Sequence, residues 1–433
     1  MPVRFTDSEF VSALTCVNCG RQYQPGDTSS MTCLTCGPVD GILDFEYDLD
    51  AVAQSWQRTP LHTRPVGSHW RYREFLPSAQ NRVPLDWAVG WTPLIAADRL
   101  ASEFGLKSLV FKDEGRNPTA SFKDRASSVG VVHALAHDAR VVACASTGNA
   151  ATSLAGHAAL AGLPCIIFVP ESAPRPKVAQ MLVYGATVLS VQGTYDDAWQ
   201  LCQSACEEFG WYNRNCAVNP VLVEGKATGG LEIAEQTQTR FGQTPDWVVV
   251  SVGDGCTIAG ICKGLSRMHC LGISDRLPRV LGVQARGVEP IKYAYEHGSL
   301  PTSPHGSTVA DSINVPVPRN WKKAVTGVRE CNGQFNAVSD DQILNAIQLA
   351  GKHGVFSEPA AAASLAGLLQ AVDDSIIRPG ESVLVLSTGS GLKDTEAAMK
   401  AAANATLIPV EPDIEKVRQA LHDMTKSDAR MNK

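Results

Sequence analysis

From about residue 90 onward, short apolar runs alternate with turns rich in Gly, Ser and Asn and with segments of helical period. Continuous apolar runs are typical of strands that are buried on both faces. Their alternation with helices predicts an α/β fold with parallel sheets covered by helices. Ligands of such sheets bind beyond the carboxyl ends of the strands, so the site is expected in the turns that follow these runs. The runs cover residues 108–112, 141–144, 166–169, 187–191, 247–252, 279–283 and 382–386.

The segment Asn-Pro-Thr-Ala-Ser-Phe-Lys-Asp-Arg at residues 117–125 presents a lysine suited to covalent chemistry. Asn-Pro ends the preceding run, and Thr119 or Ser121 is expected to cap a new helix. Lys123 then lies in the first turn, where the helix dipole disfavours a cation but not a neutral amine. The alternative is a solvated surface lysine.

Three turns that follow predicted strands carry further candidate chemistry. Ser-Thr-Gly-Asn at residues 146–149 offers hydrogen-bond donors at a helix start. Gly-Asp-Gly-Cys-Thr at 253–257 predicts a backbone cradle for phosphate, although a glycine-rich turn is also common without a ligand. It lacks the residues of a nucleotide P-loop and the spacing of a dinucleotide-binding motif. In Ser-Thr-Gly-Ser-Gly at 387–391, the hydroxyl of Thr388 can act as a neutral partner for a ring nitrogen.

Four cysteines near the N-terminus form two Cys-x-x-Cys-Gly pairs. Cys16 and Cys19 are followed, after thirteen residues, by Cys33 and Cys36. This spacing is typical of a zinc ribbon, and four thiolates would leave no open position for catalysis. A structural zinc site is therefore expected, with a former metal site as the alternative.

Composition restricts the class of protein. A chain of 433 residues with 44% hydrophobic residues is expected to form more than one compact domain. The net charge of −6 argues against a nucleic-acid-binding or acidic-membrane-binding protein, and no apolar run is long enough to cross a membrane. Thirteen cysteines, an odd number without a dense disulfide pattern, indicate a reducing cytoplasm.

In this order, the lysine segment and the three turns resemble the fold-type II pyridoxal-phosphate enzymes, and most of all the threonine synthase family. The resemblance covers nearly the whole chain. The lysine motif and the terminal turn are specific in combination, whereas the glycine turn alone is not. Further matches are Val-Ala-Gln at 178–180, Tyr-Gly-Ala at 184–186, Val-Asn-Pro at 218–220, Glu-Gly-Lys at 224–226 and Ser-Glu-Pro-Ala-Ala-Ala at 357–362.

The resemblance implies a zinc-ribbon-like module at residues 1–48, followed by a two-lobed catalytic domain at 49–404 with parallel sheets. The smaller, mobile lobe would cover about 126–225, and a C-terminal helix and tail would cover 405–433. A homodimer is compatible with this organisation.

The resemblance also assigns a role to each matching residue. Lys123 corresponds to the lysine that binds pyridoxal phosphate covalently, Asn149 to the partner of the cofactor's 3′ oxygen, and Thr388 to the partner of the ring nitrogen. The phosphate loop corresponds to Gly253, Asp254, Gly255, Cys256 and Thr257. Ser146 and Thr147 correspond to the loop that holds the substrate carboxylate, and Lys112, Ser121 and Arg125 are candidates for an anionic group of the substrate.

The implied reaction converts O-phosphohomoserine and water to threonine and phosphate. Because a hydroxyl at the ring nitrogen does not require a fully protonated ring, β-elimination and β-replacement chemistry is favoured. The alternatives are a related reaction on phosphoserine or another amino acid, and a non-catalytic cofactor-binding protein. A serine or threonine dehydratase is less favoured, since no added regulatory domain is evident. Ala120, Cys256, Thr257 and Ser390 depart from the family pattern, and Ala120 and Ser390 are expected to border the substrate.

Overall fold

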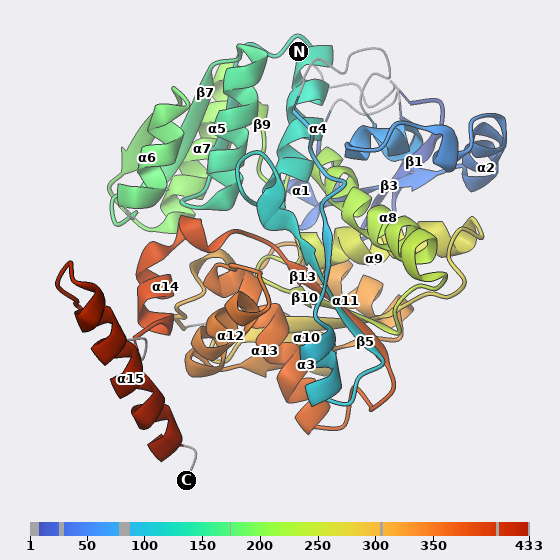
Figure 1. Cartoon of the computed structure of the whole chain (residues 1–433). Helices are drawn as coiled ribbons and strands as arrows, with labels where there is room; N and C mark the ends of the chain where they lie inside the picture. Colours follow the sequence, from blue (N-terminus) through green and yellow to red (C-terminus); the bar gives the residue numbers. More distant parts are fainter. Residues whose placement is uncertain are drawn as a thin grey trace.

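The computed structural model describes residues 8–25, 30–77, 87–173, 175–303, 306–403 and 407–431, which fold around three sheets (Figure 1). The largest sheet has the order β12-β11-β10-β13-β5-β4, and all its strands are parallel except β4, which is antiparallel to β5. Its strands are β4 (Leu94–Ala96), β5 (Ser108–Asp113), β10 (Trp247–Ser251), β11 (Arg279–Ala285), β12 (Gln334–Val338) and β13 (Ser382–Ser387). The predicted parallel arrangement is confirmed.

Both faces of this large sheet are buried, which explains its uninterrupted apolar strands. Along β10, Trp247 and Val249 enter one hydrophobic core, whereas Val248 and Val250 enter the other. The first core packs against α3 (Asp98–Glu103), α12 (Asp340–Lys352) and α13 (Pro359–Asp373). The second packs against α2 (Leu49–Arg58), α8 (Val221–Phe241), α9 (Cys256–Cys270), α10 (Pro290–His297) and α11 (Trp321–Glu330).

A second, fully parallel sheet has the order β8-β7-β6-β9 and forms the core of a smaller lobe (Figure 1, green). Its strands are β6 (Val142–Ala145), β7 (Cys165–Pro170), β8 (Thr187–Val191) and β9 (Tyr212–Asn213). Val142 and Cys144 face α4 (Lys123–Ala136), α5 (Asn149–Ala161) and α6 (Arg175–Val183), while Ala143 and Ala145 face α7 (Tyr195–Phe209). The apolar runs of the sequence predicted neither β9 in this sheet nor β4 and β12 in the large sheet.

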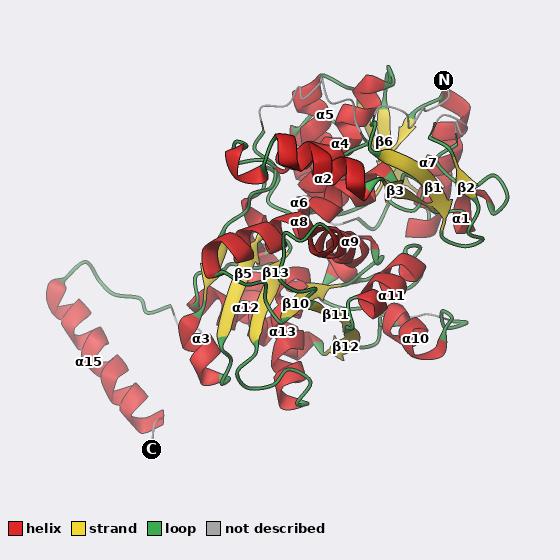
Figure 2. Cartoon of the chain, turned by 90° about the vertical axis from the view of Figure 1, so that its right-hand side faces the viewer, coloured by secondary structure: helices red, strands yellow, loops and turns green. Residues whose placement is uncertain are grey.

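The third sheet is a small antiparallel one near the N-terminus, with the order β2-β1-β3 (Figure 2). It consists of β1 (Val11–Cys16), β2 (Gln22–Tyr23) and β3 (Leu43–Tyr47), with the short α1 (Gly37–Asp40) between them. We call it the cysteine module. Its Asp44 contacts Lys263 on α9 and Lys323 on α11, at 2.7 and 3.0 Å. The module is thereby fastened to helices of the large lobe.

The C-terminal segment forms α14 (Thr395–Ala401) and then α15 (Ile414–Met431), which lies in the range 405–433 where a C-terminal helix was expected. Both views show α15 set apart from the rest of the molecule (Figures 1 and 2). Among the described residues, no helix is both long and apolar enough to cross a membrane.

Candidate active site

A cavity of about 650 Å³ is lined by residues beyond the carboxyl ends of strands from both parallel sheets. The turn 146–149 follows β6, the turn 253–257 follows β10, and Thr388 follows β13. Lys123 also lines this cavity. The structure therefore gathers every residue that was predicted to bind the cofactor, together with Ser146 and Thr147.

Lys123 is the first residue of α4, as its place in the sequence predicted. The prediction of a Thr119 or Ser121 cap is wrong, because Phe122 precedes the helix and no side chain caps it. Thr119 instead donates to Asp124 through its hydroxyl and its backbone N–H, at 2.6 and 2.7 Å. Burial of Lys123, with a smaller contribution from the nearby Lys226 cation, lowers the pKa of Lys123 to about 8. A neutral amine is therefore much more accessible here than on an exposed lysine.

The lysine segment and the terminal turn are joined directly through their backbones. Phe122 N donates to Thr388 O at 2.8 Å, and Ser390 N donates to Ala120 O at 3.1 Å. Neither Ala120 nor Ser390 is among the described residues that line the cavity, so the expectation that they border the substrate is not met. Ala120 has a φ of 63°, a conformation that glycine adopts more readily. The pairing fixes Lys123 relative to Thr388.

The turn 253–257 has the geometry of an anion cradle. A Cβ at Gly255, whose φ is 92°, would lie 2.9 Å from Asn320 O, and one at Gly253 would lie 3.0 Å from Ile313 Cα. The backbone then enters α9 at Cys256, with the helix N-terminus at the cavity. Such a terminus favours phosphate. Together with a reactive lysine and Thr388, this arrangement fits pyridoxal phosphate.

The carboxylate of Asp254 anchors the cradle. It accepts hydrogen bonds from Arg319 N at 2.8 Å and from Asn320 Nδ2 at 2.5 Å, just before α11. Burial raises its pKa, with a smaller effect from Cys216.

Two cavity cations, Arg214 and Lys226, were not assigned a role from the sequence. Gly260 of α9 lets α8 approach closely, since a Cβ there would lie 2.7 Å from Lys226 Cβ. Lys226 Nζ lies 3.2 Å from Cys216 Sγ, and Arg214 Nη1 lies 3.5 Å from the same atom. Among the described residues neither cation has a carboxylate oxygen within 4.0 Å. Two buried cations in one cavity wall, with no carboxylate partner among the described residues, indicate a place for an anionic ligand.

Glu358 is another cavity residue whose role the sequence did not reveal. Its Oε1 accepts a hydrogen bond from Asn149 Nδ2 at 2.7 Å, and it precedes α13. This contact orients the Asn149 amide at the start of α5. Glu358 and Lys226 belong to the segments 357–362 and 224–226, which match the family. That match was the only feature of the sequence that could have pointed to a role for them.

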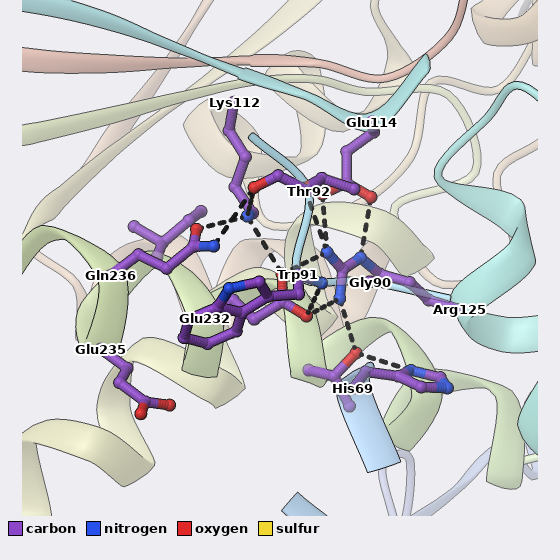
Figure 3. A network of polar contacts seen from close by, with 12 residues as sticks. His69, Gly90, Trp91, Thr92, Lys112, Glu114, Arg125, Glu232, Glu235 and Gln236 are labelled. Carbon is purple, nitrogen blue, oxygen red and sulfur yellow. Dashed lines mark hydrogen bonds and ion pairs between the residues drawn. The ribbon is translucent and has the colours of Figure 1, made fainter. Parts of the chain in front are cut away.

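The structure corrects the prediction that Lys112 and Arg125 meet the substrate. Both side chains have no exposed surface and belong to a buried network of ion pairs (Figure 3). Lys112 Nζ lies 3.0 Å from Glu232 Oε2, and Arg125 Nη2 lies 2.8 Å from Glu114 Oε1 and 2.7 Å from Glu232 Oε2. Neither residue lines the cavity. Their charges are neutralised within the network, which leaves none for a substrate.

Ser121 is likewise absent from the cavity lining. Its Oγ is buried and has no hydrogen-bond partner among the described residues.

The four predicted metal ligands of the cysteine module lie together. The Sγ atoms of Cys16, Cys19, Cys33 and Cys36 are all within 4.8 Å of one another. The glycine after each pair has a left-handed φ, 71° at Gly20 and 73° at Gly37. Each glycine lets its pair turn back around a common centre. The donor set fits a closed tetrahedral thiolate site.

Comparison with known proteins agrees with this geometry. The family model described as "Pyridoxal-phosphate dependent enzyme" matches residues 86–389. The threonine synthase of Methanosarcina acetivorans is 38% identical over 417 residues, which is 95% of this chain and 99% of that protein. The threonine synthase of Methanocaldococcus jannaschii is 37% identical, covering 94% and 99%. That of Mycobacterium tuberculosis strain H37Rv is 39% identical, covering 82% and 96%.

Solved structures support the fold. Diaminopropionate ammonia lyase from Escherichia coli aligns with a TM-score of 0.65 at 19% identity, over 79% of this chain and 94% of that one. Threonine deaminase isoform 2 from Solanum lycopersicum aligns with a TM-score of 0.63 at 22% identity, over 73% and 88%. These likenesses concern the fold alone. The family model and the full-length relatives lead to one assignment: the chain belongs to the pyridoxal-phosphate-dependent enzymes and, within them, to the threonine synthase family.

Proposed function

We propose that this protein is a lyase that converts O-phosphohomoserine and water to threonine and phosphate. The observation that carries the proposal is the single cavity that brings Lys123, the 253–257 cradle and Thr388 together. It lies in a chain that is similar over nearly its whole length to threonine synthases.

The chain's own residues account for binding of the cofactor and for proton transfer. Bound pyridoxal phosphate would supply a ring that stabilises negative charge next to the substrate's α carbon. The cradle and the α9 terminus hold its phosphate, while Asn149 and Thr388 orient its ring. Lys123 Nζ would carry protons between substrate carbons. Its pKa of about 8 suits both acceptance and donation near neutral pH.

The substrate's own groups are assigned to the remaining polar lining. Ser146 and Thr147 precede α5 and hold the carboxylate. For the substrate phosphate we assign Arg214 and Lys226 in place of Lys112 and Arg125. Support comes from their position in the cavity wall and from the lack of a carboxylate partner among the described residues. Charge-assisted hydrogen bonds to phosphate are strong in such a buried setting.

We also assign a structural zinc ion to the cysteine module and a cytoplasmic location to the protein. The four-thiolate set supports zinc as the metal. Because four thiolates leave no open position for a substrate, the role of the ion would be structural. None of the thirteen cysteines, which all lie in the described part of the chain, forms a disulfide, which fits a reducing compartment. A homodimer stays a prediction.

The test is an assay of phosphate release from O-phosphohomoserine, with O-phosphoserine and unphosphorylated homoserine in parallel and with the amino-acid products identified. The expected result is threonine from O-phosphohomoserine and little turnover of the other two. Preferential release of phosphate from O-phosphoserine would instead identify a β-elimination or β-replacement enzyme. Turnover of homoserine alone would contradict the assigned phosphate subsite.

A further inference from the structure

Two cysteines of the cavity wall come from different lobes. Cys216 follows β9 of the smaller sheet, and Cys256 is the first residue of α9, directly after the cradle of the large lobe. Their side chains are in hydrogen-bond contact. Both line the cavity, so a small solute that enters it can reach the pair.

The surroundings favour a thiolate at Cys216. Lys226 Nζ lies 3.2 Å from its sulfur and Arg214 Nη1 lies 3.5 Å from it. The hydrogen bond from Cys256 and the two cations together hold the pKa of Cys216 well below its usual value, even though burial opposes this. The thiolate is the nucleophilic form of cysteine. One sulfur of the pair is therefore activated, and the other lies within its reach.

Two other buried thiol pairs provide an internal comparison. Cys202 contacts Cys206 within α7, and Cys262 on α9 contacts Cys331 just after α11. None of these four lines the cavity, and in the described part of the chain no lysine or arginine donates to their sulfurs. Contact with the partner thiol and burial raise the pKa of Cys202, and burial followed by that contact raises the pKa of Cys262. In all three pairs the two thiols are in contact. Only Cys216 and Cys256 also line the cavity, and only this pair has a lysine and an arginine beside one of its sulfurs.

We propose that Cys216 and Cys256 are an oxidisable thiol pair that hydrogen peroxide entering the cavity converts to a disulfide between the two lobes. The Cys216 thiolate attacks one peroxide oxygen, the O–O bond breaks, and the distal oxygen leaves as water after it takes up a proton. The resulting sulfenic acid is attacked by the Cys256 sulfur, which loses its proton as the S–S bond forms and a second water leaves. Each thiol is oxidised by one electron, and the peroxide accepts both electrons.

The disulfide would change the cavity in two ways. It would join the segment after β9 covalently to the first residue of α9, at the edge of the phosphate cradle. It would also remove the thiolate charge beside Lys226 and Arg214. The modification thus lies where it alters both the link between the lobes and the electrostatics of the anion site.

The test treats the reduced holoprotein with hydrogen peroxide, alkylates the remaining thiols and maps linked peptides by mass spectrometry. Oxidation of the cysteine module is read on separate peptides and does not enter the comparison. The Cys216–Cys256 peptide is expected to form about tenfold or more faster than the Cys202–Cys206 and Cys262–Cys331 peptides, because of its larger thiolate fraction. Formation at the same rate as those pairs, or no linked peptide, would overturn the proposal.

Two matched variants sharpen the result. In Cys256→Ser, peroxide treatment is expected to leave a sulfenic acid on Cys216 that dimedone captures, whereas Cys262→Ser should still form the Cys216–Cys256 linkage. Accumulation of sulfinic acid on Cys216 in the parent, with Cys256 still reduced, would identify a single reactive thiol and refute the pair. These readouts do not depend on turnover, so they stand apart from the assignment of the substrate.

Discussion

A single residue, Ala120, in the segment that leads to Lys123 shows how this chain departs from its family. The family usually has glycine before the serine of the lysine motif, and here Ala120 occupies that position with a φ of 63°. Ala120 thus adopts a left-handed backbone conformation, which glycine tolerates best. A left-handed conformation costs a non-glycine residue about 1–2 kcal/mol.

Ala120→Gly is therefore expected to stabilise the protein. Relief of the strain exceeds the added entropy of glycine in the unfolded chain, so the expected gain in unfolding free energy is about 0.5–1 kcal/mol. Urea unfolding of the holoprotein measures it. Ala159→Gly, in the exposed part of α5, is the control and is expected to lose roughly 0.5–1 kcal/mol. A loss of stability in Ala120→Gly would show that the alanine methyl contributes more than the backbone strain costs.

The lowered pKa of Lys123 predicts the pH dependence of cofactor capture. In the protein from which pyridoxal phosphate has been removed, the neutral amine is the nucleophile. The capture rate is expected to rise with pH up to about 8 and then to level off. A lysine at its ordinary value would continue to gain rate up to about 10.5. Stopped-flow absorbance measures the rate, and an increase that continues unchanged above pH 9 would contradict the shift.

At the scale of the element, the sequence revealed the strands and turns but not the residues whose role depends on tertiary contacts. Apolar runs predicted the strands from β5 to β13, except the two-residue β9 and β12, whose Gln334 and Asn336 interrupt its pattern. Turns after strands identified the cofactor loops, because parallel strands present these ends on one side. Lys226 is in the middle of a helix and Arg214 follows a very short strand, so no local pattern marked them.

The error on Lys112 and Arg125 has the same origin. Their acidic partner Glu232 lies on α8, more than a hundred residues further along the chain, and no local pattern shows that it reaches them. In the structure the network joins β5, the start of α4 and α8, and thereby holds the helix that carries Lys123. Figure 3 shows these side chains turned toward one another.

Glu232→Gln is predicted to destabilise the fold strongly. The substitution removes the buried carboxylate that pairs with both Lys112 and Arg125. The free energy of unfolding is expected to fall by about 3–5 kcal/mol. Thermal unfolding with a cofactor-absorbance readout measures the effect. Glu396→Gln, which removes the exposed Glu396–Lys400 pair, is the control and should leave the midpoint unchanged. Near-parent stability of Glu232→Gln, combined with a large increase in KM for a phosphorylated substrate, would restore a substrate role for the network.

At the scale of the whole molecule, the cysteine module braces the helices that build the cofactor site. Lys263 of α9 is shared between Asp44 of the module, at 2.7 Å, and Glu224 of α8, at 2.7 Å. Glu224 also pairs with Arg267 at 2.7 Å. Since α9 begins at the phosphate cradle, the module supports the cradle from outside, and none of the module's described residues lines the cavity.

Cys16→Ser is accordingly predicted to lose zinc and to lower the melting temperature by several degrees, because metal binding contributes to the free energy of folding. Metal content by mass spectrometry and thermal unfolding measure the two effects. Cys270→Ser, at an exposed cysteine outside the four-thiolate cluster, is the control and should change neither. Protein purified under reducing conditions without stoichiometric zinc would refute the metal assignment.

The cavity is expected to bind pyridoxal phosphate through Lys123, and borohydride reduction can identify the lysine that holds the cofactor. Reduction of the holoprotein fixes the cofactor on the lysine that holds it, and peptide mapping identifies that lysine. Lys226 lines the same cavity, so the peptide map must distinguish cofactor on Lys123 from cofactor on Lys226. We expect the pyridoxyl group on the peptide that contains Lys123, and no trapped cofactor in Lys123→Ala. Cofactor trapped on Lys226 or on any other lysine would contradict this expectation.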